Sequence, residues 1–414
     1  MKYMTIATII AGISGFVVVI LAARAFGTDT ALTTEFAAYW GLFFAATGFL
    51  TGITQETTRA VAAAKKHGTL SPGSGSAATP LARPIVIAAW LGLITTILAA
   101  ASGPLWVGRI VSDSAGIAVG LMALGLGSYA IQAAVAGLLS GAGLWSRYAV
   151  LITLDTASRM ILAIVAWLFG WKLVAFLVIT VLGAGSWLIL VLLSAPVRAS
   201  LQLLADVPTR QFLTRLGYAI AASGASAILI TGFPTLVQLT HGADRHAAIS
   251  TAVVVYAVTL TRAPILVPLQ QFLSAIIVRF VHHTTHPRRA LIQPLALIWL
   301  VGTIGAAAAW LIGPWLMVTI LGPSYTTPAL LLALLTLGAA CTASLMVTGA
   351  ATMAVEQHRV YLLGWITATI VATLILSSPL ELSTASWLAL TVGPIAGLAV
   401  HVGGLKAGGV TNKS

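Results

Sequence analysis

Charged residues are rare in the long apolar runs of this sequence, and Arg262 is the most informative of them. It lies in a run that begins near residue 251 and is apolar enough to cross a bilayer. At a rise of about 1.5 Å per residue, Arg262 is on the order of 20 Å from Ser250, inside the hydrocarbon region. A guanidinium costs about 2.5–3.5 kcal/mol there, so it must face a partner or water. Pro264 and Pro268 loosen the helix beyond it. We interpret Arg262 as a cation lining a cavity for an anionic headgroup; a structural pair with a carboxylate is the alternative.

Asp155 and Arg159 form a second charged pattern within an apolar run. They lie four residues apart in the run 146–169, so a helix places them one turn apart on one face, where they can pair. Both lie near the middle of the run. One interpretation is a self-satisfied ion pair. The alternative is that Arg159 binds substrate while Asp155 holds it or takes up a proton.

Polar residues also gather in the inner half of the run 35–63. Glu56 and Arg59 lie three residues apart and can pair, although snorkelling to the membrane surface explains Arg59 equally well. The neighbouring Gln55 and the later Gln270 and Gln271 carry amides suited to sugar hydroxyls. The predicted polar, sugar-binding residues are therefore Gln55, Gln270, Gln271, Asp155 and Glu56.

The composition defines the class of protein. Hydrophobic residues make up 59% of the 414 residues, charged residues make up 7%, and the mean hydropathy is +1.02. A soluble domain carries roughly 25% charged residues, so the chain is predicted to be an integral membrane protein. The formal net charge of +12 arises from Lys and Arg at the ends of apolar runs. That placement is typical of membrane topology signals and does not indicate a nucleic-acid partner.

The sequence lacks the motifs of the common enzyme classes. We find no Walker A sequence, no HExxH, no GxSxG and no paired catalytic carboxylates. The single cysteine, Cys341, excludes disulfides and cysteine-based metal sites. The histidines His282, His283 and His286 have no carboxylate or cysteine beside them, so they indicate a basic surface loop. We expect a transporter that is not an enzyme and that uses no metal or other cofactor.

Windows of about 20 residues predict twelve membrane-spanning helices. Their limits are 4–26, 35–63, 84–103, 115–141, 146–169, 173–196, 217–240, 248–278, 291–312, 328–351, 359–377 and 383–404. With the N-terminus inside, fifteen Lys and Arg residues fall on the cytoplasmic side, four outside and two within spans, which accounts for all 21. This asymmetry predicts that both termini are cytoplasmic.

The two halves of the chain resemble each other weakly. Gly27-Thr-Asp29 recurs as Gly242-Ala-Asp244, and the same shift carries Gln55 to Gln270. Six spans per half is an even number, so the halves are expected to be parallel repeats. We predict an all-α protein with two six-helix bundles, 1–197 and 217–414. The cytoplasmic linker 198–216 between them either lies along the inner membrane surface or forms a solvated loop.

Several stretches of the chain resemble the MATE-like (MOP) superfamily, and within it the bacterial Wzx-type oligosaccharide and polysaccharide flippases. The resemblance covers nearly the whole chain and extends to actinobacterial members associated with polysaccharide biosynthesis. The stretches that carry it are Leu21-Ala-Ala-Arg24-Ala-Phe-Gly27, Ile53-Thr-Gln55-Glu56-Thr-Thr-Arg59-Ala, Gly137-Leu-Leu-Ser-Gly141 through Tyr148 to Asp155 and Arg159, Thr261-Arg262-Ala-Pro264, and Leu321-Gly322-Pro323-Ser-Tyr325.

The resemblance implies a flippase that moves a polyprenyl-phosphate-linked sugar or oligosaccharide to the outer leaflet of the bacterial cytoplasmic membrane. It implies alternating access around a cationic cavity, a monomer in membrane lipid, and a glycan polymerase or glycosyltransferase as partner. The arginines at the positions that related flippases use for phosphate are Arg24, Arg59, Arg159 and Arg262. The chain departs from the lipid II flippases, which resemble fourteen-helix proteins. Two alternatives remain: a MATE-type exporter of cationic drugs that uses Asp155, and a non-transporting partner of a glycosyltransferase.

Overall fold

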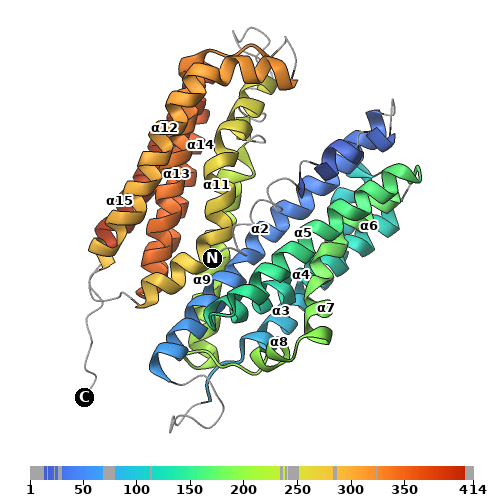
Figure 1. Ribbon diagram of the computed structural model, residues 1–414, viewed down its shortest axis with the longest axis vertical. Helices are drawn as coiled ribbons and strands as arrows, with labels where there is room; N and C mark the ends of the chain where they lie inside the picture. Colours follow the sequence, from blue (N-terminus) through green and yellow to red (C-terminus); the bar gives the residue numbers. More distant parts are fainter. Residues whose placement is uncertain are drawn as a thin grey trace. The chain divides into compact units, whose positions relative to one another are not determined.

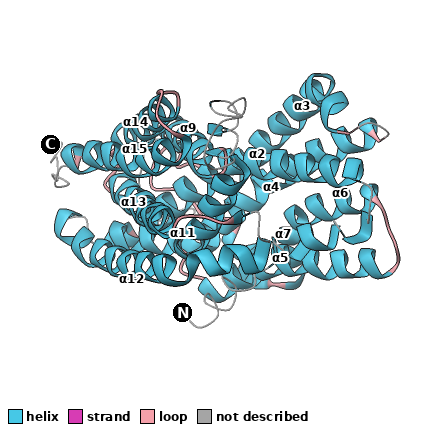
Figure 2. Cartoon of the chain, turned by 90° about the horizontal axis from the view of Figure 1, so that it is seen from above, coloured by secondary structure: helices cyan, strands magenta, loops and turns pink. Residues whose placement is uncertain are grey.

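The apolar runs of the sequence form long helices in a computed structural model of the chain. The structure describes residues 14–15, 17–22, 24–26, 30–68, 80–111, 114–233, 236–237, 240, 251–282, 287–321 and 325–405. Across these residues the regular elements are helices, and the one β-bridge joins Leu81 to Pro208 (Figure 2). The predicted all-α membrane architecture is confirmed.

Contacts between residues divide the chain into two units, Met1–Ile220 (unit 1) and Ala221–Ser414 (unit 2). The helices of unit 1 (Figure 1) are α2 (Thr30–His67), α3 (Pro84–Ile110), α4 (Ala115–Gly141), α5 (Trp145–Leu168), α6 (Leu173–Leu182), the 3₁₀ turn η1 (Gly183–Gly185), α7 (Ser186–Leu193) and α8 (Ala195–Ser200). The helix α9 (Thr209–Ile230) crosses the boundary. The helices of unit 2 are α11 (Thr251–His282), α12 (Pro287–Leu321), α13 (Ala329–Ala354), α14 (His358–Leu376) and α15 (Leu382–Gly404).

Ten helical segments in the described part of the chain are long and apolar enough to span a membrane. With α2 and the apolar helix Val17–Phe26, they give each of the twelve predicted spans a helical counterpart. The rest of the first predicted span, before residue 14, lies outside the described residues. The helix α2 has 38 residues, about 57 Å at 1.5 Å per residue, so it is longer than the hydrocarbon layer.

Two predicted spans are interrupted in ways that hydropathy does not report. The sixth contains the 3₁₀ turn η1 between α6 and α7. The seventh was predicted at 217–240, but α9 begins eight residues earlier and ends at Ile230, where a turn follows. The C-terminal part of the predicted linker 198–216 is therefore helical and continuous with a span. The prediction of a solvated loop there is wrong, because Phe212 and Leu216 are buried.

The rest of the linker region is held by backbone hydrogen bonds. The amide of Ala82 donates to the carbonyl oxygen of Val207 at 2.9 Å, and the amide of Ala205 donates to the carbonyl oxygen of Ala82 at 2.9 Å. Leu204 and Val207 are buried beside them. The segment between α8 and α9 is thus part of the body of unit 1. Whether the two halves work as two separate bundles stays a prediction.

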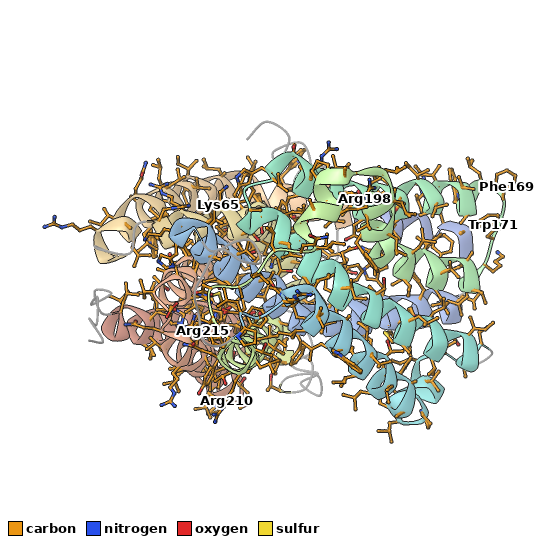
Figure 3. The ribbon with its side chains drawn as sticks, turned by 90° about the horizontal axis from the view of Figure 1, so that it is seen from below. Lys65, Phe169, Trp171, Arg198, Arg210 and Arg215 are labelled. Carbon is orange, nitrogen blue, oxygen red and sulfur yellow. The ribbon has the colours of Figure 1, made fainter. Side chains whose placement is uncertain are left out.

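Two exposed basic residues of unit 1 lie away from the exposed aromatic residues of the α5–α6 turn. Figure 3 shows the exposed Lys65 and Arg198 well separated from Phe169 and Trp171, which are exposed around the α5–α6 turn. Lys65 Nζ donates to the carbonyl oxygen of Ala142 at 2.7 Å. Basic and aromatic residues near the ends of apolar helices are typical of a membrane-spanning bundle.

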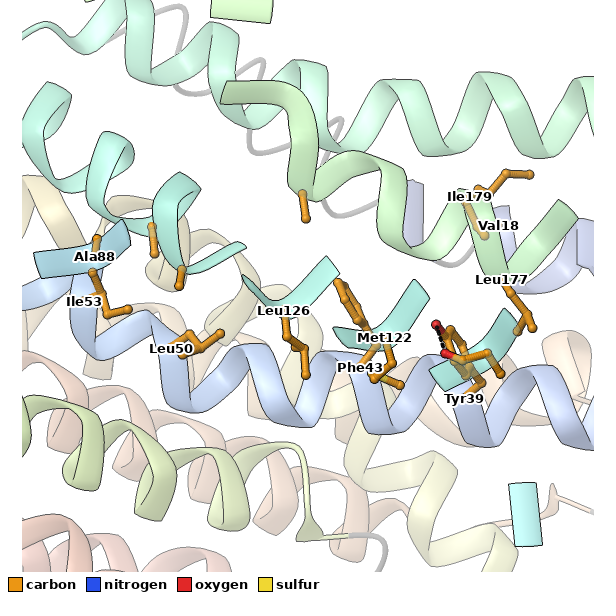
Figure 4. Packing of buried hydrophobic residues seen from close by; sticks show 14 of the residues in the cluster. Val18, Tyr39, Phe43, Leu50, Ile53, Ala88, Met122, Leu126, Leu177 and Ile179 are labelled. Atoms are coloured by element: carbon orange, nitrogen blue, oxygen red, sulfur yellow. Dashed lines mark hydrogen bonds between the residues drawn. The ribbon is translucent and has the colours of Figure 1, made fainter. Parts of the chain in front are cut away.

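The core of unit 1 is formed by apolar side chains of several helices, as Figure 4 shows. Tyr39 and Phe43 of α2 are completely buried and lie beside Met122 and Leu126 of α4. The Tyr39 hydroxyl donates to the carbonyl oxygen of Ala118 at 3.3 Å. This bond matters because an unsatisfied polar group in lipid costs several kcal/mol.

The helix α13 lies at the centre of unit 2, and its neighbour α15 carries a buried histidine. His401 is fully buried; its Nε2 lies 3.0 Å from the carbonyl oxygen of Tyr361 and its Nδ1 lies 3.1 Å from Thr348 Oγ1. A carbonyl only accepts, so Nε2 carries the proton. The ring rests on Gly364, where an added Cβ would overlap it. His401 therefore joins α13, α14 and α15 through polar contacts.

Close helix crossing in unit 1 depends on Gly52. A Cβ added there would lie 2.5 Å from the amide nitrogen of Ile220 and 2.6 Å from the carbonyl carbon of Ala219. The backbones of α2 and α9 therefore touch, which is how helices in lipid gain packing energy.

We expect Gly52→Ala to lower the thermal stability of the protein, and Gly41→Ala to leave it unchanged or raise it. The methyl group at position 52 overlaps backbone atoms that cannot rotate away, which costs about 1–3 kcal/mol. Gly41 lies in the same helix with open space around its Cβ, and alanine favours helix there by up to about 1 kcal/mol. Thermal unfolding of the detergent-purified variants measures the difference. Equal transition temperatures would contradict the close crossing.

Candidate functional site

Arg262 lies on α11 in unit 2 and is 5% exposed. Its Nη1 donates to the carbonyl oxygen of Ile230 at 3.2 Å and lies 3.5 Å from that of Leu229. These carbonyls end α9, where the last helical acceptors have no partner within the helix. The ring of Phe233 lies 5.0 Å from the guanidinium carbon. Arg262 thus caps a helix end whose dipole favours a cation.

The other edge of the same guanidinium is open. Arg262 Nε and Nη2 are buried, and among the described residues neither has a hydrogen-bond partner. These two N–H groups point in the same direction and form the fork that grips a carboxylate or phosphate through two oxygens. The alternative of a structural pair with a carboxylate is not found in the described part of the chain. Arg262 therefore keeps Nε and Nη2 unpaired among the described residues while Nη1 is engaged.

Asp155 and Arg159 make an ion pair on α5 in unit 1. Arg159 Nη2 lies 2.8 Å from Asp155 Oδ1, with side chains 6% and 18% exposed. The guanidinium carbon lies 5.1 Å from the centre of the Phe44 ring on α2. A Cβ added at Gly183 would overlap both Asp155 Oδ1 and Arg159 Nε. The pair consequently rests on the bare backbone of η1.

The opposite side of η1 is held by α4. Ser128 Oγ donates to the carbonyl oxygen of Ala184 at 2.7 Å and accepts from Trp187 Nε1 at 3.0 Å. The amide of Trp187 donates to Gln132 Oε1 at 3.4 Å. Ser128 and Gln132 lie four residues apart and so share a face of α4. They satisfy backbone groups that the break in the span leaves free.

Arg59 lies in a closed ionic cluster. Its Nε and Nη2 donate to Glu56 at 2.8–3.0 Å, and Nη1 and Nη2 donate to Asp206 at 2.9 and 2.8 Å. Arg215 Nη1 lies 3.5 Å from Asp206 Oδ2. Glu56 and Arg59 are completely buried. This arrangement ties α2 to the linker and α9, and it leaves Arg59 no donor directed at a ligand.

The remaining predicted residues lie in varied surroundings. Arg24 is exposed on the Val17–Phe26 segment, Gln55 is buried on α2, Gln270 is exposed and Gln271 is half-buried on α11. Within unit 2, the two amides follow Arg262 by about two turns. Their grouping with Gln55 into one sugar-binding surface stays a prediction.

Several residues that shape these sites were missed in the sequence. Asp206 is the one acidic residue of the predicted linker, and an acid within an otherwise basic segment is a signal of a buried partner. Gly183-Ala-Gly185 interrupts an apolar run, which is a signal of a break. Phe44 and Phe233 carried no such signal, because aromatic residues occur in nearly all of the predicted spans.

The whole chain has the fold of MATE-family transporters. A multidrug resistance MATE transporter of the MOP superfamily, in its outward-facing conformation, matches with a TM-score of 0.69 and 17% identity over 96% of this chain and 94% of that chain. A MATE protein in complex with MaD3S matches with 0.73 and 17% over 97% and 95%. A MOP superfamily transporter from Pyrococcus furiosus matches with 0.73 and 15% over 98% and 94%. At these identities the likeness defines the fold.

Sequence comparison places the chain in a family. No family model matches. The chain is 38% identical over 396 residues to the uncharacterized protein Rv3630 of Mycobacterium tuberculosis, across 96% of this chain and 89% of the relative. It is 37% identical over 399 residues to the uncharacterized protein Rv1510 of the same strain, across 96% and 90%. The chain belongs to the family of these mycobacterial proteins.

We expect Arg59→Met to destabilise the protein strongly. The change removes the cation between two buried carboxylates, and breaking a buried pair from one side costs about 3–5 kcal/mol. The yield of monodisperse protein and its transition temperature in detergent measure the loss. Arg147→Met, at an exposed position, is the control. A stable Arg59→Met protein with a selective loss of ligand binding would contradict a structural role.

We expect Gly183→Ala to destabilise the protein and Gly185→Ala to have little effect. Both glycines have ordinary negative φ values, −56° and −94°, so neither substitution strains the backbone. The added methyl at 183 collides with the ion pair, at a cost of about 1–3 kcal/mol, whereas the one at 185 meets nothing. The transition temperatures of the two detergent-purified variants measure the loss of stability caused by each substitution. If Gly185→Ala were as unstable as Gly183→Ala, the 3₁₀ turn would tolerate no side chain at either position. The collision with the Asp155–Arg159 pair would then not explain the effect.

Proposed function

We propose that the protein is a transporter that moves a polyprenyl-phosphate-linked sugar or oligosaccharide from the inner to the outer leaflet of the bacterial cytoplasmic membrane. It does so by alternating access, with both termini in the cytoplasm, and it supplies cell-envelope polysaccharide synthesis. The observation that carries the proposal is the open guanidinium fork of Arg262, buried in a membrane span.

The open fork supports an anionic substrate. A guanidinium without a counter-charge is unfavourable in a dry site, so a ligand that brings two in-plane oxygens gains strongly from binding there. A phosphate headgroup supplies both the charge and the oxygens. Its polyprenyl tail remains in the lipid around the helices, many of which expose large apolar side chains.

The same charge pattern weighs against the drug-exporter alternative. An exporter of cations needs a membrane carboxylate that a cation can reach. Asp155 is paired with Arg159, and Glu56 is enclosed with Arg59. The binding pocket of the Pyrococcus furiosus transporter of this fold is described as having reversed polarity. That description supports the view that one fold serves substrates of different charge.

We propose Arg262 as the main phosphate contact and Arg159 as a further one. Arg59 is not among the proposed phosphate contacts, because both of its edges are occupied by carboxylates. Arg24 is retained as an outer contact on the first span. Gln270 and Gln271 are the proposed sugar contacts nearest in sequence to Arg262, and a monomer in contact with membrane lipids is the proposed working form.

The test is transfer of a fluorescent polyprenyl-phosphate sugar across proteoliposomes. Loss of charge-assisted hydrogen bonds costs about 1.5–3 kcal/mol, so we expect Arg262→Ala to slow transfer by roughly 10–100-fold. Arg262→Lys should fail similarly, because an ammonium has no fork. Arg198→Ala is the matched control: Arg198 Nη1 also caps a span, donating to the carbonyl oxygens of Val191 and Leu192 at 3.0 and 2.9 Å, but Arg198 is exposed.

The outcomes separate the candidate functions. Wild-type transfer by a monodisperse Arg262→Ala protein would contradict the proposal. Export of a cationic dye, lost in Asp155→Asn, would favour the drug exporter instead. No transfer of either probe, with co-purification of a glycosyltransferase, would favour the non-transporting partner.

A further inference from the structure

The Asp155–Arg159 contact is short but poorly directed. The two atoms lie 2.8 Å apart, yet Asp155 Oδ1, Arg159 Nε and Arg159 Nη2 are buried without a partner in hydrogen-bond geometry among the described residues. The attraction is therefore mainly Coulombic. Most of the directed hydrogen bonding that makes a charged pair strong is not used.

Arg59 in the same unit shows what a permanent pair looks like. Its guanidinium donates directed hydrogen bonds to Glu56 and Asp206 on both edges. Arg159 has one carboxylate beside it, and its other neighbours include the Phe44 ring and the bare backbone of Gly183. Arg59 is therefore held by directed hydrogen bonds on both edges. Among the described residues, Arg159 has unused donors on Nε and Nη2.

A transporter that releases an anion needs a second negative group close to the cation that bound the anion. If Arg159 bound the substrate with no counter-charge nearby, departure of the substrate would leave an unpaired cation in a dry site, which is costly. Asp155 is placed one helical turn away and half-buried, so its carboxylate can take the place of the departing anion.

We propose that Asp155 is an internal competitor for the substrate anion. It neutralises Arg159 when the site is empty, yields the guanidinium to an anionic headgroup, and takes it back as the headgroup leaves. Asp155 is then a positioning residue that limits affinity and speeds release. This role rests on the proposed function, since it needs an anionic substrate.

The test is the concentration dependence of transport of the fluorescent polyprenyl-phosphate sugar. Asp155→Asn keeps the shape of the side chain but removes the competing charge. We expect the KM to fall by about fivefold and the kcat to fall by a similar factor, because binding tightens and release slows. Asp155→Glu restores the charge and should move both constants back toward wild type. A merely structural role would lower the kcat without lowering the KM.

A double-mutant cycle with Arg159→Ala completes the design. Once Arg159 is absent, Asp155→Asn should no longer lower the KM, since its charge then has nothing to compete for. Transition temperatures of all variants confirm that each is folded. Arg262-dependent transport by the wild type, with an unchanged or raised KM in Asp155→Asn, would overturn this inference alone. A wild-type protein that does not transport the probe would overturn the proposed function, and this inference with it.

Discussion

The absence of water in the bilayer interior determines what each arginine in this protein can do. A guanidinium there must be neutralised, capped or supplied with a ligand. The described residues contain the first two solutions: Arg59 is enclosed by two carboxylates, Arg159 shares one loosely, and Arg262 caps a helix end while its Nε and Nη2 have no hydrogen-bond partner there. The differences lie in the neighbours, since the side chain is the same.

Those neighbours depend on breaks in the spans. The last carbonyls of α9 are available to Arg262 because the helix ends at Ile230 inside the predicted seventh span. Arg159 has room beside α6 because η1 presents a glycine there. A continuous helix would satisfy its own backbone and present side chains at both places. The two interrupted spans thus create the surroundings that let a cation remain in a dry site without full pairing.

The long apolar runs allowed the helical class and most span limits to be predicted, because hydropathy reports burial in lipid directly. The limits of 115–141 and 383–404 lie within one residue of α4 and α15. The pairing of Asp155 with Arg159 followed from their spacing. The role of Arg59 could not be predicted from spacing, because its second partner, Asp206, lies 147 residues away and is brought close by the folded linker. Helix ends such as Ile230 depend on local backbone hydrogen bonds. A hydropathy average over 20 residues does not detect them.

The continuity of α9 has a practical consequence for dividing the chain into halves. The single helix α9 belongs to both units, and its middle, at Ala219 and Ile220, packs against Gly52. A cut at the unit boundary would sever helical hydrogen bonds in the middle of a span. A cut ahead of Thr209 would keep α9 whole, but the C-terminal fragment would then carry the segment Thr209–Ile220, whose packing partner Gly52 is on the other polypeptide. The two fragments should therefore need each other during membrane insertion. We expect them to assemble only when they are co-expressed in the same cell.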